Sequence, residues 1–429
     1  MKEMAKNKDI IYCVYDGIIT QSVFDSQVLG PLKELRKNEE IKVSLIAFEN
    51  AQVFLFQNKK LREKKREITS KLSIRVNFYP RIPGWIGIYL VTLLLIPFLC
   101  KSIRKRKIVF HARGAKAAFT GCKLKKVLPS LGVLYDSRGV EPEEYLYFLR
   151  SQILNGRTNL VWKERETFRK LKQVEEYVIR RVDRIFSVST EMKKHFLKIY
   201  NIEEKRISIV PCGIDETVFL FDEKTRDTMR KEMGLRNKLV FVYSGSMHPL
   251  QMPMAMLKLF REFYKLDKEV FFLILTFQVE KIEKLLKSEL VPPENYAALS
   301  VEHSKVPMYL NAADIGILLR EKNIVNMVAC PTKFAEYVAC GLYVILTEKI
   351  GDISGIVRKE KIGEVVKSSL EESEMKSVVN KILAKRVEIQ KKGNKERIAQ
   401  FAQTKYSWKN LMATFWKTYE YLSKKSALE

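Results

Sequence analysis

The chain has 429 residues, which is enough for two domains of about 200 residues each, and its 46% hydrophobic and 30% charged composition excludes a low-complexity chain. Six scattered cysteines show no metal-ligand spacing, and no secretory signal is expected, so a reducing cytoplasm is the simplest location. The net charge is +27, and residues 1–200 hold 40 Lys and Arg against 20 Asp and Glu.

In the first half, short β-branched runs alternate with longer charged segments of helical periodicity. This alternation is typical of parallel βαβ units. An amphipathic pattern over residues 168–182 is the clearest helix. The expected strands are 9–15, 42–49, 73–79, 107–112, 132–136, 184–188 and 206–211.

Two basic runs, 59–66 and 101–107, carry much of the excess positive charge. They would attract a polyanion, either nucleic acid or the anionic inner leaflet of a membrane, although solvated helix faces are the alternative. Residues 82–100 lack charge and are long enough to span a bilayer. Strand-like neighbours on both sides, with Pro83 and Pro97, favour a helix that covers the sheet and dips into the membrane interface. A spanning helix stays the alternative.

The second half repeats the rhythm, so the sequence predicts an α/β protein of two doubly wound, Rossmann-like domains. The expected domains are 1–212, 213–403 and a final aromatic helix in 404–429 that crosses back to the first domain. Expected helices are 254–264, 280–290, 307–313, 331–340 and 408–422. Expected strands are 238–243, 270–276, 298–302, 314–320, 342–347 and 364–366.

The most informative chemical pattern is a strand, a loop and a helix that Pro331 begins and Gly341 follows. In its first turn, Thr332, Lys333 and Glu336 share one side. This turn follows the carboxyl end of a strand, so its amides and Lys333 can hold a phosphate. Glu336, one turn further, can accept hydrogen bonds from a pair of sugar hydroxyls. The alternative is an ordinary exposed pair of Lys333 and Glu336.

Residues 331–345 closely resemble the donor-binding segment of glycosyltransferase family 4, whose members have the GT-B fold and retain anomeric configuration. Residues 182–194 and 209–215 look like the end of that family's first domain. Residues 239–246 look like the opening strand and glycine turn of its second domain. The resemblance runs in order from about residue 107 onward, and it implies two Rossmann-like domains that face each other across a cleft.

The resemblance also implies roles for individual residues. Glu336 matches the glutamate that binds the donor ribose, while Thr332 and Lys333 match residues beside the diphosphate. Gly245 and Ser246 match the turn whose backbone approaches the phosphates.

Further candidates come from the first half of the chain. His111 resembles a histidine near the donor sugar, and Gly17 resembles the loop where acceptor meets donor. Arg113 and Arg138 are candidates to anchor the acceptor, or alternatively to cap helices.

Two departures from the family pattern stand out. The motif's first glutamate falls on Val328, so a carboxylate that would engage the donor sugar is missing or replaced. In addition, residues 243–257 contain no Lys or Arg where many members carry a basic residue. Arg320, Lys333 and His248 must then neutralise the leaving diphosphate.

The expected activity is therefore a retaining transfer of a sugar from a nucleotide-diphosphate sugar, without a metal or other cofactor, to a saccharide or lipid-linked saccharide. The basic first half suggests work at the inner membrane face, in surface-polysaccharide assembly. A nucleotide-sugar epimerase on the same fold is one alternative. A basic nucleic-acid-binding protein is another, although no RNA-binding module supports it.

Overall fold

The computed structural model describes residues 8–19, 23–82, 107–154 and 162–425, together with 87, 90, 92, 93, 95 and 96. The chain divides into two compact units. The first unit comprises Met1–Gly213 and Trp408–Glu429, and the second comprises Ile214–Ser407. The sequence placed these two divisions at residues 212/213 and 403/404.

A parallel sheet of seven described strands forms the centre of the first unit, in the order β3-β2-β1-β4-β5-β6-β7. Its strands are β1 (Lys8–Val14), β2 (Ile41–Asn50), β3 (Arg75–Arg81), β4 (Lys107–Arg113), β5 (Gly132–Asp136), β6 (Arg184–Ser187) and β7 (Ile207–Ile209). The chain reverses direction across the sheet between β1 and β4, which are neighbours although they are not consecutive. This order is the doubly wound arrangement that the sequence predicted.

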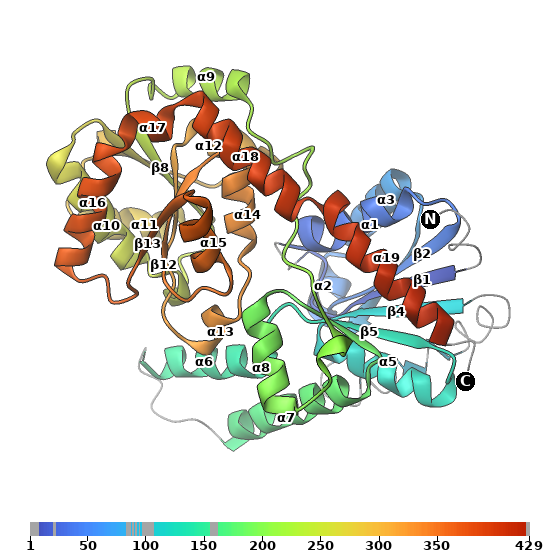
Figure 1. The fold of residues 1–429 in the computed structure, drawn as a ribbon. Coiled ribbons are helices and arrows are strands. Elements are labelled where there is room, and N and C mark those ends of the chain that lie inside the picture. Colours follow the sequence, from blue (N-terminus) through green and yellow to red (C-terminus); the bar gives the residue numbers. More distant parts are fainter. Residues whose placement is uncertain are drawn as a thin grey trace. The chain divides into compact units, whose positions relative to one another are not determined.

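Helices cover this sheet, and the last helix of the chain is one of them. Helix α19 (Trp408–Lys425) packs on α1, β4 and β5, as Figure 1 shows in red. Trp408 begins it and is 1% exposed, with its indole N–H donating to the Ser26 carbonyl. The other helical elements are η1 (Asp25–Leu29), α1 (Gly30–Arg36), α2 (Ala51–Phe56), α3 (Asn58–Leu72), α5 (Ala115–Val127), α6 (Glu141–Leu154), α7 (Trp162–Arg181), α8 (Thr190–Tyr200) and η2 (Glu204–Arg206).

The second unit is built on a parallel sheet of six described strands in the order β10-β9-β8-β11-β12-β13. These are β8 (Leu239–Ser244), β9 (Val270–Leu275), β10 (Tyr296–Leu299), β11 (Ile315–Leu318), β12 (Tyr343–Thr347) and β13 (Gly363–Val366). Strands β9, β11 and β12 are buried along their whole length, which is why they appear in the sequence as continuous apolar runs.

Helices flank this sheet as well (Figure 1). They are α9 (Glu223–Glu232), η3 (Pro249–Gln251), α10 (Pro253–Leu266), α11 (Val279–Ser288), η4 (Pro293–Asn295), η5 (His303–Lys305), α12 (Val306–Ala312), α13 (Ile324–Met327), α14 (Thr332–Ala339), α15 (Ile353–Glu360), α16 (Glu372–Ala384), α17 (Arg386–Gln390) and α18 (Lys392–Tyr406). The prediction of two α/β domains with parallel sheets is confirmed.

Strand β10 is displaced from its predicted position. The sequence predicted 298–302, whereas β10 is Tyr296–Leu299. Pairing with β9 sets the register, since Tyr296 lies opposite Phe272 and Leu299 opposite Leu275, the last residue of β9. The strand therefore ends where its neighbour ends.

The segment predicted to dip into the membrane interface, residues 82–100, lies mostly outside the described residues. Residues 101–106 of the basic run beyond it are not described either. Within the part of the chain that is described, no helix combines the length and apolarity needed to cross a bilayer.

Candidate active site

The second sheet reverses its strand order between β8 and β11. In open α/β sheets, ligands bind beyond the carboxyl ends of the two strands that flank such a reversal. Gly245 directly follows β8, and Arg320 lies two residues after β11. The fold therefore places two predicted site residues at the position where a ligand is expected.

Gly245 lies in a turn that only glycine fits. Its φ angle is +145°, and a Cβ added there would lie 2.0 Å from Lys333 Nζ. The Gly245 N–H donates to the Leu275 carbonyl at 2.8 Å, which holds the turn against β9. The neighbouring Ser246 carbonyl accepts a 2.6 Å hydrogen bond from the Tyr243 hydroxyl. The structure thus brings the glycine turn into contact with Lys333, the lysine that was predicted to bind a phosphate.

Lys333 points across this turn. Its Nζ lies 3.3 Å from both the Tyr243 hydroxyl and the Gln251 Oε1, and 4.7 Å from the centre of the Tyr243 ring. Burial, followed by the nearby Arg320 guanidinium, lowers the pKa of Lys333 to about 7, although Glu336 opposes the change. An anion beside this ammonium would stabilise its charged form.

Arg320 is held in place by its backbone. Its N–H donates to Thr347 Oγ1 at 2.9 Å, and the same hydroxyl donates back to the Arg320 carbonyl at 2.8 Å. Its side-chain Nε is buried without a hydrogen-bond partner among the described residues. In one orientation of the Gln251 amide, the oxygen accepts from the Arg320 guanidinium at 2.8 and 3.2 Å, and in the other it accepts from Lys333. Two cations therefore share one neutral acceptor, which favours an added anion.

Helix α14 closes one side of the site. It begins at Thr332, with Pro331 at the N-cap and no capping side chain, so Pro331 stands one residue before the position that the sequence predicted. Glu336 is only 7% exposed, and its Oε1 lies 3.8 Å from His303 Nε2. Lys333 and Glu336 are therefore not the exposed surface pair that the alternative interpretation required.

Val328, where the sequence departs from the family pattern, lies in the loop before α14. Val328 is 2% exposed and ends the short turn α13, where its N–H donates to the Ile324 carbonyl. The preceding loop is held by amide side chains, since Asn323 caps the turn and Asn326 donates to the Glu321 carbonyl at 2.7 Å. A buried apolar side chain therefore stands where the resemblance places a carboxylate.

In the first unit, the structure shows what surrounds His111. Its side chain is 0% exposed, stacked 4.2 Å from the Tyr12 ring. Its Nδ1 lies 2.6 Å from the Tyr419 hydroxyl of α19, and its Nε2 lies 3.2 Å from Asp136 Oδ2. Burial lowers the pKa of His111, although Asp136 opposes this. The ring is thus enclosed between Tyr419 and Asp136 and is not exposed to solvent.

The two arginine candidates differ in how they are engaged. Arg138 pairs with Asp136 at 2.8 Å and donates to the Val210 carbonyl, so its charge is satisfied internally. Burial alone would raise the pKa of Asp136, but Arg138, with His111 and Arg113, outweighs it and lowers that pKa. Arg113 lies farther from carboxylates, at 3.8 Å from Asp136, and its buried Nη1 has no hydrogen-bond partner in the described structure.

Arg113 is also the candidate closest to the loop after β1. Its Nε lies 4.0 Å from Asp16, the residue before Gly17, and the φ angle of Gly17 is +111°. Of the acceptor candidates, Gly17 and Arg113 therefore share the carboxyl edge of the first sheet, whereas Arg138 is committed to Asp136. No group of His, Cys, Asp or Glu side chains that could hold a metal occurs among the described residues.

The fold recurs in solved glycosyltransferases. Anabaena HepE, in complex with UDP-glucose, shares 13% identity with a TM-score of 0.66, over 96% of this chain and 99% of HepE. WaaG, a glycosyltransferase involved in lipopolysaccharide biosynthesis, shares 12% identity with a TM-score of 0.61, over 94% of this chain and 98% of WaaG. Among curated proteins, no sequence matches significantly.

The sequence decides the family. Residues 49–218 match the family described as Glycosyltransferase Family 4. This region belongs to glycosyltransferase family 4. The predicted resemblance and the predicted GT-B fold are therefore both confirmed, and the chain is a glycosyltransferase of GT-B type. A Listeria monocytogenes structure described as a UDP-N-acetylglucosamine 2-epimerase is also similar, at 11% identity and a TM-score of 0.58, over 98% of this chain and 97% of that one.

Sequence reasoning missed two members of this candidate site. Tyr243 and Gln251 both contact Lys333, yet neither was predicted. Gln251 lies six residues beyond the glycine turn, in the stretch that lacks Lys and Arg. Its polar amide beside that turn was the only signal in the sequence.

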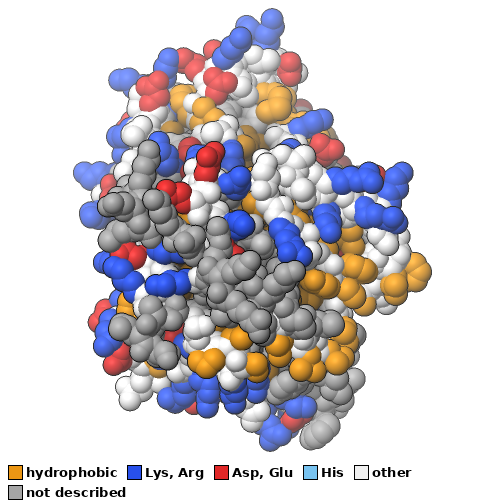
Figure 2. Space-filling model, turned by 90° about the vertical axis from the view of Figure 1, so that its right-hand side faces the viewer, with side chains coloured by type: hydrophobic (Ala, Val, Ile, Leu, Met, Phe, Trp, Pro, Cys, Tyr) orange, Lys and Arg blue, Asp and Glu red, His pale blue; other side chains and the backbone are white. Residues whose placement is uncertain are grey.

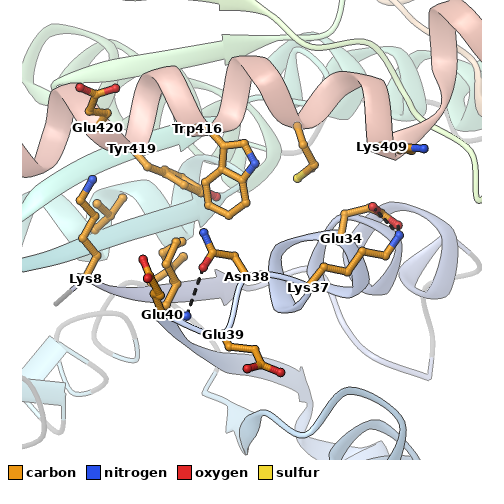
Figure 3. A pocket seen from close by; sticks show the side chains of 14 residues that line it. Lys8, Glu34, Lys37, Asn38, Glu39, Glu40, Lys409, Trp416, Tyr419 and Glu420 are labelled. Atoms are coloured by element: carbon orange, nitrogen blue, oxygen red, sulfur yellow. Dashed lines mark hydrogen bonds and ion pairs between the residues drawn. The ribbon is translucent and has the colours of Figure 1, made fainter. Parts of the chain in front are cut away.

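A cavity of about 710 Å³ lies at the opposite, amino-terminal edge of the first sheet (Figure 3). Lys8 and Ile41, the first residues of β1 and β2, line it together with Trp416 and Tyr419 of α19. Because ligands of such sheets bind beyond the carboxyl ends of strands, this cavity is not the predicted substrate site.

Proposed function

We propose that this glycosyltransferase moves a sugar from a nucleotide-diphosphate sugar to a saccharide or lipid-linked saccharide, with retention of anomeric configuration. The observation that carries the proposal is the group of Gly245, Arg320 and Lys333 at the strand reversal of the second sheet. Two cations around a turn that admits only glycine form a seat for a diphosphate. HepE, which shares the fold, is described in complex with UDP-glucose.

The chemistry follows from where charge develops. When the bond between the anomeric carbon and the phosphate oxygen breaks, negative charge accumulates on the leaving diphosphate. Lys333, Arg320 and the free amides at Thr332 lie ready to stabilise that charge, and preorganised groups of this kind usually make the largest electrostatic contribution to catalysis. Glu336 accepts hydrogen bonds from the ribose hydroxyls.

The acceptor hydroxyl attacks the face that the leaving group vacates. Its oxygen forms the new bond to the anomeric carbon, and its proton passes to the departing phosphate. The leaving group thus serves as the base, and the proposal assigns that role to no carboxylate. Gly17 and Arg113, at the carboxyl edge of the first sheet, are the residues that we assign to the acceptor.

We further propose that the acceptor lies at an anionic membrane surface, in the assembly of a surface polysaccharide. Helix α2 ends in Leu55 and Phe56, which are 72% and 84% exposed. The exposed side chains of Lys59, Lys60 and Arg62 follow in α3. Figure 2 shows Lys and Arg side chains beside exposed hydrophobic side chains on one face. Apolar side chains that insert, next to cations that bind headgroups, fit a lipid surface better than nucleic acid.

A thermal-shift screen with UDP-, GDP- and ADP-sugars tests the donor assignment. A ligand at 100 times its Kd stabilises the protein by about 2.7 kcal/mol, so the right nucleotide sugar should raise Tm by several degrees. Product analysis then separates the two enzyme classes. Without acceptor, a transferase can at most hydrolyse the donor and release the unchanged sugar, whereas an altered nucleotide sugar would favour the epimerase, whose fold this chain shares.

Vesicle sedimentation tests the membrane assignment. Vesicles of phosphatidylcholine with phosphatidylglycerol should bind the protein, and pure phosphatidylcholine should not. Replacing Leu55 and Phe56 together by Ser should weaken binding at least tenfold, because both apolar insertions are lost. Leu266→Ser is the matched control, since Leu266 is 62% exposed in the second unit. Equal binding by both variants would contradict the assigned surface.

A further inference from the structure

The loop after β1 is tied to the end of β2 by one carboxylate. Oε2 of Glu49 accepts hydrogen bonds from the backbone N–H groups of Ile18 at 2.7 Å and Ile19 at 2.8 Å. Its Oε1 accepts from the N–H of Asn50 at 2.7 Å. Strand β1 ends at Val14 opposite Ala47 of β2, so β2 extends beyond it and places Glu49 beside the loop.

Glu49 is 0% exposed, so its hydrogen bonds are made away from solvent. Taking a carboxylate out of water is costly unless several donors compensate. Here three backbone N–H groups do so, and hydrogen bonds to a charged acceptor are about twice as strong as neutral ones. Both oxygens must accept, which a carboxylate can do and an amide side chain cannot.

The segment that Glu49 holds carries the acceptor assignment. Gly17 precedes the two bonded amides directly, and Asp16 before it lies 4.0 Å from Arg113. Asp16 Oδ1 also lies 3.4 Å from the position of a Cβ on Gly114, the residue that follows β4. The hydrogen bonds to Ile18 and Ile19 therefore hold the loop against the carboxyl end of β4. Strands β1 and β4 are the two neighbours between which the strand order of the first sheet reverses.

We propose that Glu49 is a positioning residue for the acceptor: it clamps the loop after β1 so that Gly17 and Arg113 keep one geometry at the carboxyl edge of the first sheet. The inference rests on the proposed transfer reaction. It assigns no contact between Glu49 and either substrate, because the side chain is fully enclosed. Glu49 acts through the two amides of Ile18 and Ile19.

The test is Glu49→Gln in the full-length protein. The glutamine amide has the same shape, but its NH₂ group must face the N–H of either Asn50 or the loop residues. Two hydrogen-bond donors then face each other, and at least one of the original hydrogen bonds is lost. Hydrogen exchange followed by mass spectrometry should show the amides of Ile18 and Ile19 exchanging at least tenfold faster. Transfer of radiolabelled sugar to the native cell membrane fraction should fall at least tenfold relative to hydrolysis of the donor by water.

Asp183→Asn is the matched control. Asp183 is another buried carboxylate of the first unit, and it accepts from the Val133 N–H at 2.9 Å near the amino end of β5. Both variants should lower Tm, but Asp183→Asn should keep the wild-type ratio of transfer to hydrolysis. A general loss of stability would reduce both rates together.

The outcomes separate the inference from the function on which it rests. If the wild type transfers no sugar to membranes, the proposed function fails and the inference fails with it. If the wild type transfers sugar and Glu49→Gln keeps both the slow exchange and the ratio, only the inference is overturned. Unchanged nucleotide-sugar affinity in Glu49→Gln is expected, because the donor site belongs to the second unit.

Discussion

The low pKa of Lys333 makes donor binding depend on pH in a direction that the structure fixes. Burial, with Arg320 next in importance, lowers the pKa of this ammonium to about 7 in the free site. A bound diphosphate raises it again, because an anion favours the charged form. Affinity is therefore full below the free pKa and falls as pH rises through and above 7. An ordinary exposed lysine would stay charged up to about pH 10.

The size of the effect follows from the fraction of charged sites. With a pKa of about 7, Lys333 is mostly charged at pH 6 but charged in only ~1% of molecules at pH 9. Because the charge contributes about 2 kcal/mol to binding, the Kd for a nucleotide sugar should weaken by roughly 20-fold between these values. Lys333→Gln should bind roughly 30-fold more weakly at pH 6, for the loss of a charge-assisted hydrogen bond of about 2 kcal/mol, and should lack the pH dependence.

Isothermal titration calorimetry measures both quantities. A nucleotide sugar is the right ligand, because a free nucleoside diphosphate titrates its own terminal phosphate near pH 6. Titrations at pH 8 in two buffers of different ionisation enthalpy should show proton uptake by the wild type and none by Lys333→Gln. Lys265→Gln is the control, since Lys265 pairs with Glu262 on the surface. Equal Kd at pH 6 and pH 9 without proton uptake would refute the reasoning.

Three further predictions concern the remaining residues. Gly245→Ala should weaken nucleotide-sugar binding at least tenfold, because the new methyl would lie 2.0 Å from Lys333 Nζ, whereas Gly393→Ala, in open space, should leave it unchanged in the same titration. Glu336→Gln should weaken nucleotide-sugar binding about tenfold and leave pyrophosphate binding intact, and an equal loss for both ligands would contradict a ribose contact. Because burial lowers the pKa of His111, stability should be fully present above pH 6.5 and fall as the medium is acidified; denaturant melts of His111→Phe should show a smaller loss between pH 7 and pH 5.

The fold was predictable because both sheets are parallel and buried. Strands such as Val270–Leu275 are apolar along their whole length and are separated by amphipathic helices, so the sequence shows them without any tertiary information. The register between neighbouring strands was harder to predict from the sequence. The ends of β10 depend on its pairing with β9, which lies 20 residues or more earlier in the chain.

The residues of the candidate donor site were predictable only as separate motifs. Gly245 and Lys333 each match a motif, but their contact joins residues 88 positions apart and exists only in the folded second unit. The contacts of Tyr243 and Gln251 with Lys333 depend on the same three-dimensional arrangement. Residue type and spacing in the sequence do not indicate such tertiary contacts.

The surroundings of His111 could not be predicted for a related reason. A histidine near a strand end can face a ligand or the core, and the strand alone does not distinguish them. The deciding partner is Tyr419, 308 residues away on the helix that returns to the first unit. Glu49 was missed similarly, since nothing in the sequence marks a carboxylate that binds backbone amides of another strand's loop.

The most direct test of the diphosphate seat is a crystal structure with the nucleotide sugar that gives the largest thermal shift. The account predicts phosphate oxygens within hydrogen-bonding distance of Lys333 Nζ and the Arg320 guanidinium, with the Gly245 backbone against the diphosphate. A nucleotide sugar bound with its phosphates away from these three residues would contradict it.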